Sequence, residues 1–284
     1  MYYRLGVSNT EELIKRIIDV STCRPDERRL EEFLNVLREV VERRVSSSVI
    51  KIEEVFKSGV DVVPFFSRSY PCELLKYRSL GNVIYPPLIL YVRNLVDMNS
   101  KPLIAVVGTR ECSKWGREVA FRIGELVAKK SYTLVTGLAE GIDASATEGA
   151  LKVGGWVIGV RPWLSPLSLP NEARKILEYS PSRISVVAET YSKPKVRSKS
   201  DVAYLYYLRN RIIAGMSKVV VVVEARNKPH SGSMHQIELA LKRGKPVIIM
   251  EHPERGGTYW EAYRRYVSKG AIPAKDPEEV VGII

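Results

Sequence analysis

The chain has 284 residues, a formal net charge of +12 and three cysteines, Cys23, Cys72 and Cys112, that lie far apart without a CxxC spacing. The length predicts one large α/β domain and one smaller domain, and the cysteine spacing argues against a disulfide framework and a zinc site. Without a recognisable signal peptide or membrane-spanning run, we expect a cytoplasmic protein with no membrane attachment. The positive charge favours a polyanion such as nucleic acid as partner, but a solvated lysine-rich surface also explains it.

Residues 1–58 are expected to form a small helical domain. Apolar side chains recur there at spacings of three and four, which is typical of an amphipathic helix, and a second helix is expected at Leu13 to Val20. Residues 59–100 are expected to connect this domain to the next one through extended edge elements. Pro86 and Pro87 precede the apolar run Leu88 to Val92, and prolines at such a place favour an edge strand. The helical face consists of Leu30, Phe33, Leu34, Leu37, Val40 and Val41.

Residues 101–284 alternate apolar runs with helical patterns, which predicts a doubly wound, mostly parallel sheet between helix layers. The run of valines from Val219 to Val223 has no polar alternation and suits a strand covered on both faces. We expect Ser113, Asp143 and Asp276 to cap helices, and Ser233 to form a capping box with Gln236. The predicted strands are Leu103 to Val107, Leu134 to Gly137, Trp156 to Val160, Ile184 to Ala188, Val219 to Val223, Val247 to Met250 and Ala271 to Ala274.

Three glycine-bearing turns follow predicted strands of this sheet. Glycine permits close backbone approach, and the free N–H groups of a following helix favour phosphate, so the turns predict a phosphate cradle at the carboxyl edge. The alternative is that tight strand-to-helix turns need glycine without any ligand. The patterns GxxxxGK[ST] and GxGxxG are absent, which disfavours a nucleoside triphosphatase and an ordinary dinucleotide enzyme. The turns are Gly108-Thr109-Arg110, Gly137 to Gly141, and Ser231-Gly232-Ser233.

The segment from Lys193 to Arg211 combines basic side chains with tyrosines. Cations that follow a backbone and rings that accept unstacked bases are what single-strand binding requires, and Tyr206 and Tyr207 are the candidates for stacking. The alternative is a solvated basic loop whose tyrosines pack on the core. The basic residues are Lys193, Lys195, Arg197, Lys199, Arg209 and Arg211.

No convincing catalytic constellation is recognisable, and the histidines show no metal spacing, so we expect neither an enzyme nor a metal or cofactor. Asp143, Glu189 and Glu224 lie near strand ends, where a carboxyl group can act as acid or base. A second hypothesis is therefore a nucleotide-binding sensor or an N-glycosidic nucleotide hydrolase that uses Glu224 or Glu189. The PGGxGTxxE signature of such hydrolases is absent.

Four ordered motifs resemble the DNA-processing protein A family, also called DprA or Smf. The motifs are IAVVGTRECSKWG, VTGLAEGIDASATEGAL, LRNRIIAGMSKVVVVVEA and SGSMHQIELALKRGKPV, within a similarity that runs from about Gly59 to the C-terminus. The resemblance implies a Rossmann-like domain that binds single-stranded DNA without strong sequence preference, forms homodimers and loads a RecA-type recombinase. It assigns DNA contacts to Gly108, Thr109, Arg110, Arg209, Asn210, Arg211, Ser231, Gly232 and Ser233.

The chain departs from this family pattern at three places. Thr147 stands where the family has histidine, Tyr206-Tyr207 replaces an aromatic-proline pair, and residues 160–164 replace a glycine-rich segment. These departures affect the expected shape of the pocket and the expected path of the DNA.

Overall fold

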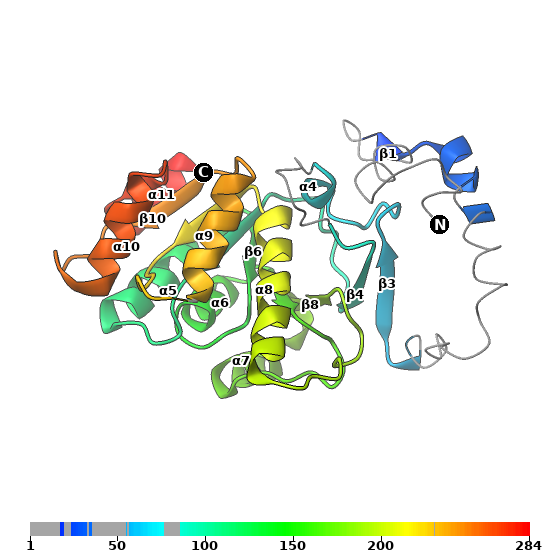
Figure 1. The fold of residues 1–284 in the computed structure, drawn as a ribbon, viewed down its shortest axis with the longest axis horizontal. Helices are drawn as coiled ribbons and strands as arrows, with labels where there is room; N and C mark the ends of the chain where they lie inside the picture. Colours follow the sequence, from blue (N-terminus) through cyan, green and yellow to red (C-terminus); the bar gives the residue numbers. More distant parts are fainter. Residues whose placement is uncertain are drawn as a thin grey trace.

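A computed structural model describes residues 18–19, 24–32, 34–35, 55, 57–76, 86–229 and 231–284. The described strands form one large mixed sheet and a two-stranded pair (Figure 1). In the large sheet the order is β11-β10-β9-β5-β6-β7-β8-β4-β3. Its strands are β3 (Val60–Pro64), β4 (Ile89–Arg93), β5 (Leu103–Val107), β6 (Thr133–Thr136), β7 (Val157–Arg161), β8 (Ile184–Ala188), β9 (Val219–Val222), β10 (Val247–Met250) and β11 (Ile272–Ala274).

Every pairing from β11 to β8 is parallel, whereas β4 runs antiparallel to both β8 and β3. The strand order reverses at β5, because the chain first adds β6, β7 and β8 on one side and then crosses to add β9, β10 and β11 on the other. In open α/β sheets such a reversal leaves a crevice at the carboxyl ends of the strands, and ligands bind there. The predicted doubly wound, Rossmann-like class is confirmed.

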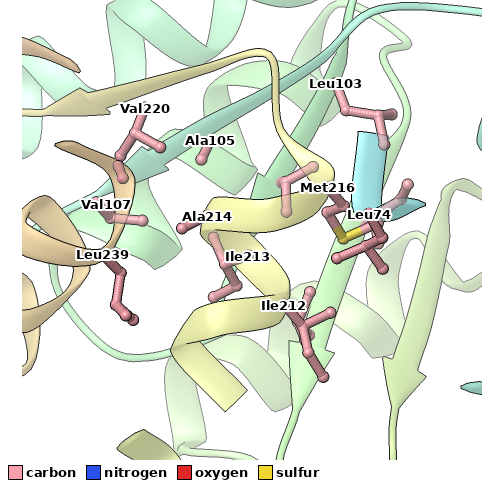
Figure 2. Packing of buried hydrophobic residues seen from close by; sticks show 14 of the residues in the cluster. Leu74, Leu103, Ala105, Val107, Ile212, Ile213, Ala214, Met216, Val220 and Leu239 are labelled. Carbon is pink, nitrogen blue, oxygen red and sulfur yellow. The ribbon is translucent and has the colours of Figure 1, made fainter. Parts of the chain in front are cut away.

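Two apolar cores cover the two faces of the sheet. On one face, α8 (Lys199–Met216), α9 (Gly232–Lys242), α10 (Gly257–Val267) and α4 (Cys72–Leu75) pack against alternate strand residues. Figure 2 shows Ile213 and Ala214 of α8 facing Val107 and Val220 of the central strands. The other face is covered by α5 (Lys114–Lys129), α6 (Ile142–Lys152), α7 (Asn171–Tyr179) and α11 (Pro277–Ile283).

Several predictions about the first hundred residues are corrected. The run at β4 is not an edge strand, because it pairs with β3 on one side and β8 on the other. Ile18–Asp19 forms strand β1 opposite β2 (Arg24–Pro25) instead of ending a helix. The β-branched, buried Ile18 favours that extended backbone. Residues 27–32 and 34–35 are helical, while most of the predicted amphipathic face lies outside the described residues.

The cysteine prediction also needs a correction. Cys72 is disulfide-bonded, whereas Cys112 is free. Wide spacing along a sequence says little about distance in the fold, so the spacing argument failed at Cys72. Among the described residues, no helix is long and apolar enough to cross a membrane.

Candidate nucleic-acid interface

The first two glycine-bearing turns touch each other at the point where the strand order reverses. The Thr109 N–H donates to the carbonyl of Glu224 (2.9 Å), and the Ile142 N–H donates to the carbonyl of Thr109 (3.4 Å). Gly141 has a φ of +76°, and a Cβ there would lie 2.3 Å from the carbonyl oxygen of Arg110. Glycine is therefore required at position 141 both for the backbone conformation and for the close approach of the two turns.

Asp143 does not cap α6, contrary to the prediction, because the N-cap position is Gly141. Its carboxylate instead accepts from the N–H groups of Gly137 (2.8 Å) and Ala139 (3.4 Å), and so holds the turn that precedes the helix. Burial raises the pKa of Asp143, and the nearby positive charge of Arg209 opposes that shift. The second turn is thus built around a buried carboxyl group.

Three guanidinium groups surround the ring of Tyr206. The Cζ atoms of Arg110 and Arg161 lie 5.7 Å from the ring centroid, and that of Arg209 lies 5.5 Å from it. Trp163 contacts the same ring in a T-shaped arrangement at 6.3 Å. We call Arg110, Arg161 and Arg209 the arginine cluster.

Arg209 is one of two buried members of the arginine cluster, the other being Arg161. Arg209 is 7% exposed, and its Nε has no hydrogen-bond partner within the described part of the chain. Burial lowers the pKa of Arg209 to about 10, and the nearby charge of Asp143 counteracts the shift. A Cβ at Gly137 would lie 1.7 Å from its Nη1, so only glycine leaves room for the guanidinium against this turn.

Arg161 ends β7 and holds the second turn in place. Its guanidinium donates to the carbonyls of Gly137 (3.0 Å), Leu138 (3.3 Å) and Ser168 (2.6 Å), and to the hydroxyl of Tyr206 (3.3 Å). Burial lowers its pKa. The prediction from sequence missed this residue; the available signal was an arginine at the carboxyl end of an otherwise apolar strand.

The charges of the arginine cluster are only partly balanced. Asp143 is the carboxyl group that interacts electrostatically with both Arg161 and Arg209, while Arg110 and Arg161 repel Arg209. Arg110 is exposed and no ion pair is formed by it among the described residues. A partly desolvated group of three cations with one counter-charge favours an incoming anion, because the anion removes their mutual repulsion.

The third turn is joined to α8 through Asn210. The Asn210 amide donates to the carbonyl of Gly232 (3.3 Å) and lies 3.4 Å from Nδ1 of His235. Ser231, not Ser233, is the N-cap of α9, and its hydroxyl accepts from the Met234 N–H (3.4 Å). The capping-box prediction is therefore wrong, and the two serine hydroxyls contact each other at 3.0 Å.

The remaining basic residues are divided between paired and exposed. Arg211 donates from Nη2 to both carboxylate oxygens of Glu189 at 2.6 Å, and its side chain is buried. Arg211 is therefore already paired within the protein, unlike Arg110. The side chains of Lys193, Lys195, Arg197 and Lys199 are exposed before and at the start of α8.

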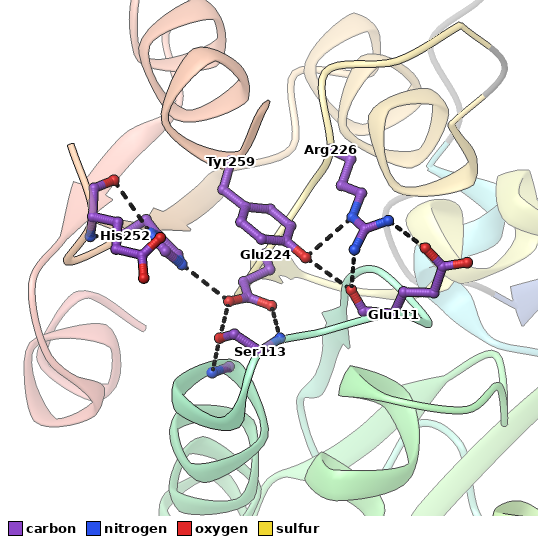
Figure 3. A network of polar contacts seen from close by, with 8 residues as sticks. Glu111, Ser113, Glu224, Arg226, His252 and Tyr259 are labelled. Atoms are coloured by element: carbon purple, nitrogen blue, oxygen red, sulfur yellow. Dashed lines mark hydrogen bonds and ion pairs between the residues drawn. The ribbon is translucent and has the colours of Figure 1, made fainter. Parts of the chain in front are cut away.

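Glu224 is occupied by structural contacts. Its buried carboxylate accepts from the N–H (2.9 Å) and hydroxyl (2.5 Å) of Ser113, and lies 3.2 Å from Nε2 of His252 (Figure 3). Ser113 is the N-cap of α5, as predicted, and accepts from the Gly116 N–H. The carboxylate of Glu224 thus holds the start of α5 and faces the interior.

A second part of this network fixes the backbone next to Arg110. The carbonyl of Glu111 accepts from the Tyr259 hydroxyl (2.8 Å) and from Nη2 of Arg226 (3.0 Å), and the Glu111 carboxylate pairs with Arg226. Figure 3 shows both partners converging on Glu111. Arg110 consequently combines a fixed backbone with an exposed side chain.

Within the described ranges, no group of three or more histidine, cysteine, aspartate or glutamate side chains is placed to hold a metal ion.

Comparison with known proteins shows the family of the chain. The family model described as DNA recombination-mediator protein A matches residues 61–283. Protein Smf of Escherichia coli is 30% identical over 262 residues, which are 89% of this chain and 63% of that protein. DNA processing protein DprA of Bacillus subtilis is 27% identical over 195 residues, which are 68% of this chain and 61% of that protein. The chain therefore spans less than two thirds of the length of these relatives.

Two solved structures share the fold. The crystal structure of DNA processing protein A from Streptococcus pneumoniae has a TM-score of 0.70 at 23% identity and covers 99% of this chain and 95% of that one. DNA processing protein A from Helicobacter pylori, whose structure was described for its single-stranded DNA binding mode, has a TM-score of 0.60 at 24% identity. That match covers 73% of this chain and 94% of the other.

Proposed function

Because the chain belongs to the DNA recombination-mediator protein A family, we propose that it binds single-stranded DNA without strong sequence preference in DNA processing and recombination. The observation that carries this proposal is the arginine cluster around Tyr206, at the reversal of the strand order. Contacts to phosphates position a nucleic acid but carry no sequence information, so such a cluster suits binding that ignores sequence. The single-stranded DNA binding mode described for the Helicobacter pylori relative supports the proposal.

The members of the site take different roles in this proposal. Arg110 is the exposed phosphate contact, and Gly108 and Thr109 hold its turn in place, because the N–H and the carbonyl of Thr109 are both bonded within the protein. Gly137, Gly141 and Arg209 form the floor of the site. Ser231, Gly232 and Ser233 offer a second anion position at the start of α9, joined to the first through Asn210. Arg211 positions the carboxyl edge of β8 through Glu189 and does not contact DNA directly.

The test is a fluorescence-anisotropy titration with a labelled 20-mer of dT and a duplex of the same length at several salt concentrations. The logarithm of the affinity for dT should fall against the logarithm of salt by about 0.7 per phosphate neutralised. Arg110→Ala should lower affinity for all single-stranded sequences alike and reduce that slope. Arg264→Ala changes the net charge equally at an exposed position on α10 and serves as the matched control. Equal affinities of the two variants would contradict the proposed site.

The hydrolase hypothesis is disfavoured, because its two candidate carboxylates are engaged: Glu224 by Ser113 and Glu189 by Arg211. It would regain support if free base accumulated when the protein was incubated with nucleoside monophosphates. Homodimer formation and loading of a RecA-type recombinase remain predictions from the family resemblance, and a cytoplasmic location remains a prediction from the sequence. A strand-exchange assay with recombinase and a single-strand-coating protein would measure the loading.

A further inference from the structure

A column of three stacked rings lies on the outer side of α8 and α9. The rings of Tyr204 and Tyr207 are nearly parallel, at an interplanar angle of 10° and a centroid separation of 6.3 Å. The ring of His235 continues the column, 3.4 Å from Tyr207 at an angle of 19°. Helices α8 and α9, which carry these residues, run side by side (Figure 1).

Packing in the protein interior does not account for this column. Tyr204 is 58% exposed and Tyr207 is 44% exposed, and neither belongs to the two apolar cores. Tyr179 shows the contrast: it is 90% exposed and makes no ring contact with the other described aromatic side chains. Aligned rings that are exposed to water present an apolar, flat surface on which another ring can stack.

His235 gives the column a rigid inner end. It is half-buried, its Nε2 has no hydrogen-bond partner among the described residues, and burial lowers its pKa to about 4. The imidazole is therefore neutral near pH 7, and the rings of the column carry no charge there. Asn210 lies beside Nδ1 of His235 and also contacts Gly232, so the column is fastened to the third turn.

The column adjoins the arginine cluster. Along α8, Arg209 of the cluster and Tyr206, which the cluster surrounds, alternate with Tyr207 of the column and Asn210, which contacts His235. Three guanidinium groups and Trp163 already surround the ring of Tyr206, which leaves Tyr207 as the more accessible of the two tyrosines first considered for stacking. Exposed cations precede the column in the chain: Lys195 lies on the connection into α8, and Lys199 is the first residue of that helix.

We propose that Tyr204, Tyr207 and His235 form a platform on which unpaired bases stack while the arginine cluster holds the phosphates of the same strand. This inference rests on the proposed single-stranded DNA binding. Stacking is tolerant of sequence because every base has a π-face, so the platform adds affinity without adding sequence preference. Tyr204 is the outer end of the platform and Tyr207 its centre.

The test compares dT 20-mers with 20-mers of abasic sites, which keep the phosphates and lack the bases. The wild-type protein should bind dT more tightly than the abasic strand. Tyr204→Ala/Tyr207→Ala should weaken dT binding by about 5- to 150-fold per base lost from the stack, and should leave abasic binding within about 2-fold. Tyr179→Ala, which removes an exposed tyrosine from α7, should change neither affinity.

Four outcomes decide the matter. Loss confined to dT supports the platform, whereas equal loss on both strands, or no loss on dT, overturns it. If the wild-type protein binds neither strand, the proposed function itself fails. Tyr204→Ala alone removes only a largely exposed side chain, so it tests the same prediction if the double variant unfolds, and a loss limited to dT is again expected.

Discussion

Replacement of Gly137 by alanine tests whether the enclosed position of Arg209 matters for binding. The new Cβ would lie 1.7 Å from Nη1, 2.7 Å from Cζ and 2.9 Å from Nη2 of Arg209, whereas ordinary contacts begin at 3.4 Å. Nη1 must therefore move by about 1.7 Å, the difference between 3.4 and 1.7 Å. The movement takes the end of a flexible side chain away from the anion position, so a loss of folding stability of about 1–3 kcal/mol is expected from overpacking.

The larger effect should appear in DNA binding. A hydrogen bond to a charged group contributes about 1.5–3 kcal/mol, so displacing the guanidinium should weaken dT binding by roughly 10- to 150-fold. Anisotropy titrations of Gly137→Ala, Arg209→Ala and the double variant form a double-mutant cycle. If the clash acts through Arg209, Gly137→Ala should change affinity less than about 2-fold once Arg209 is absent.

Additive losses in that cycle would refute the reasoning, because they would mean that the turn at Gly137 acts independently of Arg209. Gly282→Ala is the matched control: a Cβ at that position in α11 meets no atom within 4 Å. It should bind dT as the wild type does.

Three further predictions concern the supports of the site. Arg161→Met should lower the free energy of unfolding by about 2–4 kcal/mol in urea titrations, because it leaves buried carbonyls such as that of Gly137 without a donor; unchanged stability would mean that water replaces the guanidinium. Ser113→Ala should cost at least about 0.5–2 kcal/mol in the same assay, because it removes both the N-cap of α5 and the hydroxyl that donates to the buried carboxylate of Glu224; a stability equal to that of the wild type would contradict these roles. The pKa of His235 is about 4 in the folded chain and 6.5 when unperturbed, so the unfolded chain binds more protons between these values and stability should fall as the pH drops from 6.5 towards 4. His235→Phe should remove about 1–2 kcal/mol of that loss, a value reduced for partial exposure, and identical pH profiles of both proteins would contradict the assignment.

The sheet could be predicted from sequence because its strands are nearly unmixed apolar runs. Val219 to Val222, for example, are all buried, and alternate members face the two cores. A run of this kind has few alternatives to a central parallel strand. The prediction of an edge strand at β4 was wrong for a physical reason. Proline at the start of a strand removes only one hydrogen bond of the ladder, so β4 can still pair on its outer side with β3.

The site was predicted only in part, because turns can be recognised locally while partners cannot. The glycines of the first two turns follow strands, and the structure places them together at the reversal of strand order. Arg161 and Tyr206 lie 45 residues apart, and nothing in the spacing indicates that they share a hydrogen bond. The engagement of Arg211 by Glu189 depends likewise on the relative placement of α8 and β8.

The double anchorage of Glu111 by Arg226 and Tyr259 has a kinetic consequence. Ordering the backbone of one loop residue costs about 1–2 kcal/mol of conformational entropy. Glu111 is already ordered in the folded protein, so ligand binding does not have to order it. We expect capture of a strand to proceed at a rate governed by diffusion and long-range attraction, with no slow rearrangement after encounter. Because Tyr259 belongs to α10, loss of its hydroxyl should slow strand uptake by loosening the backbone beside Arg110, whereas a change at an outer position of α10 such as Arg264 should not.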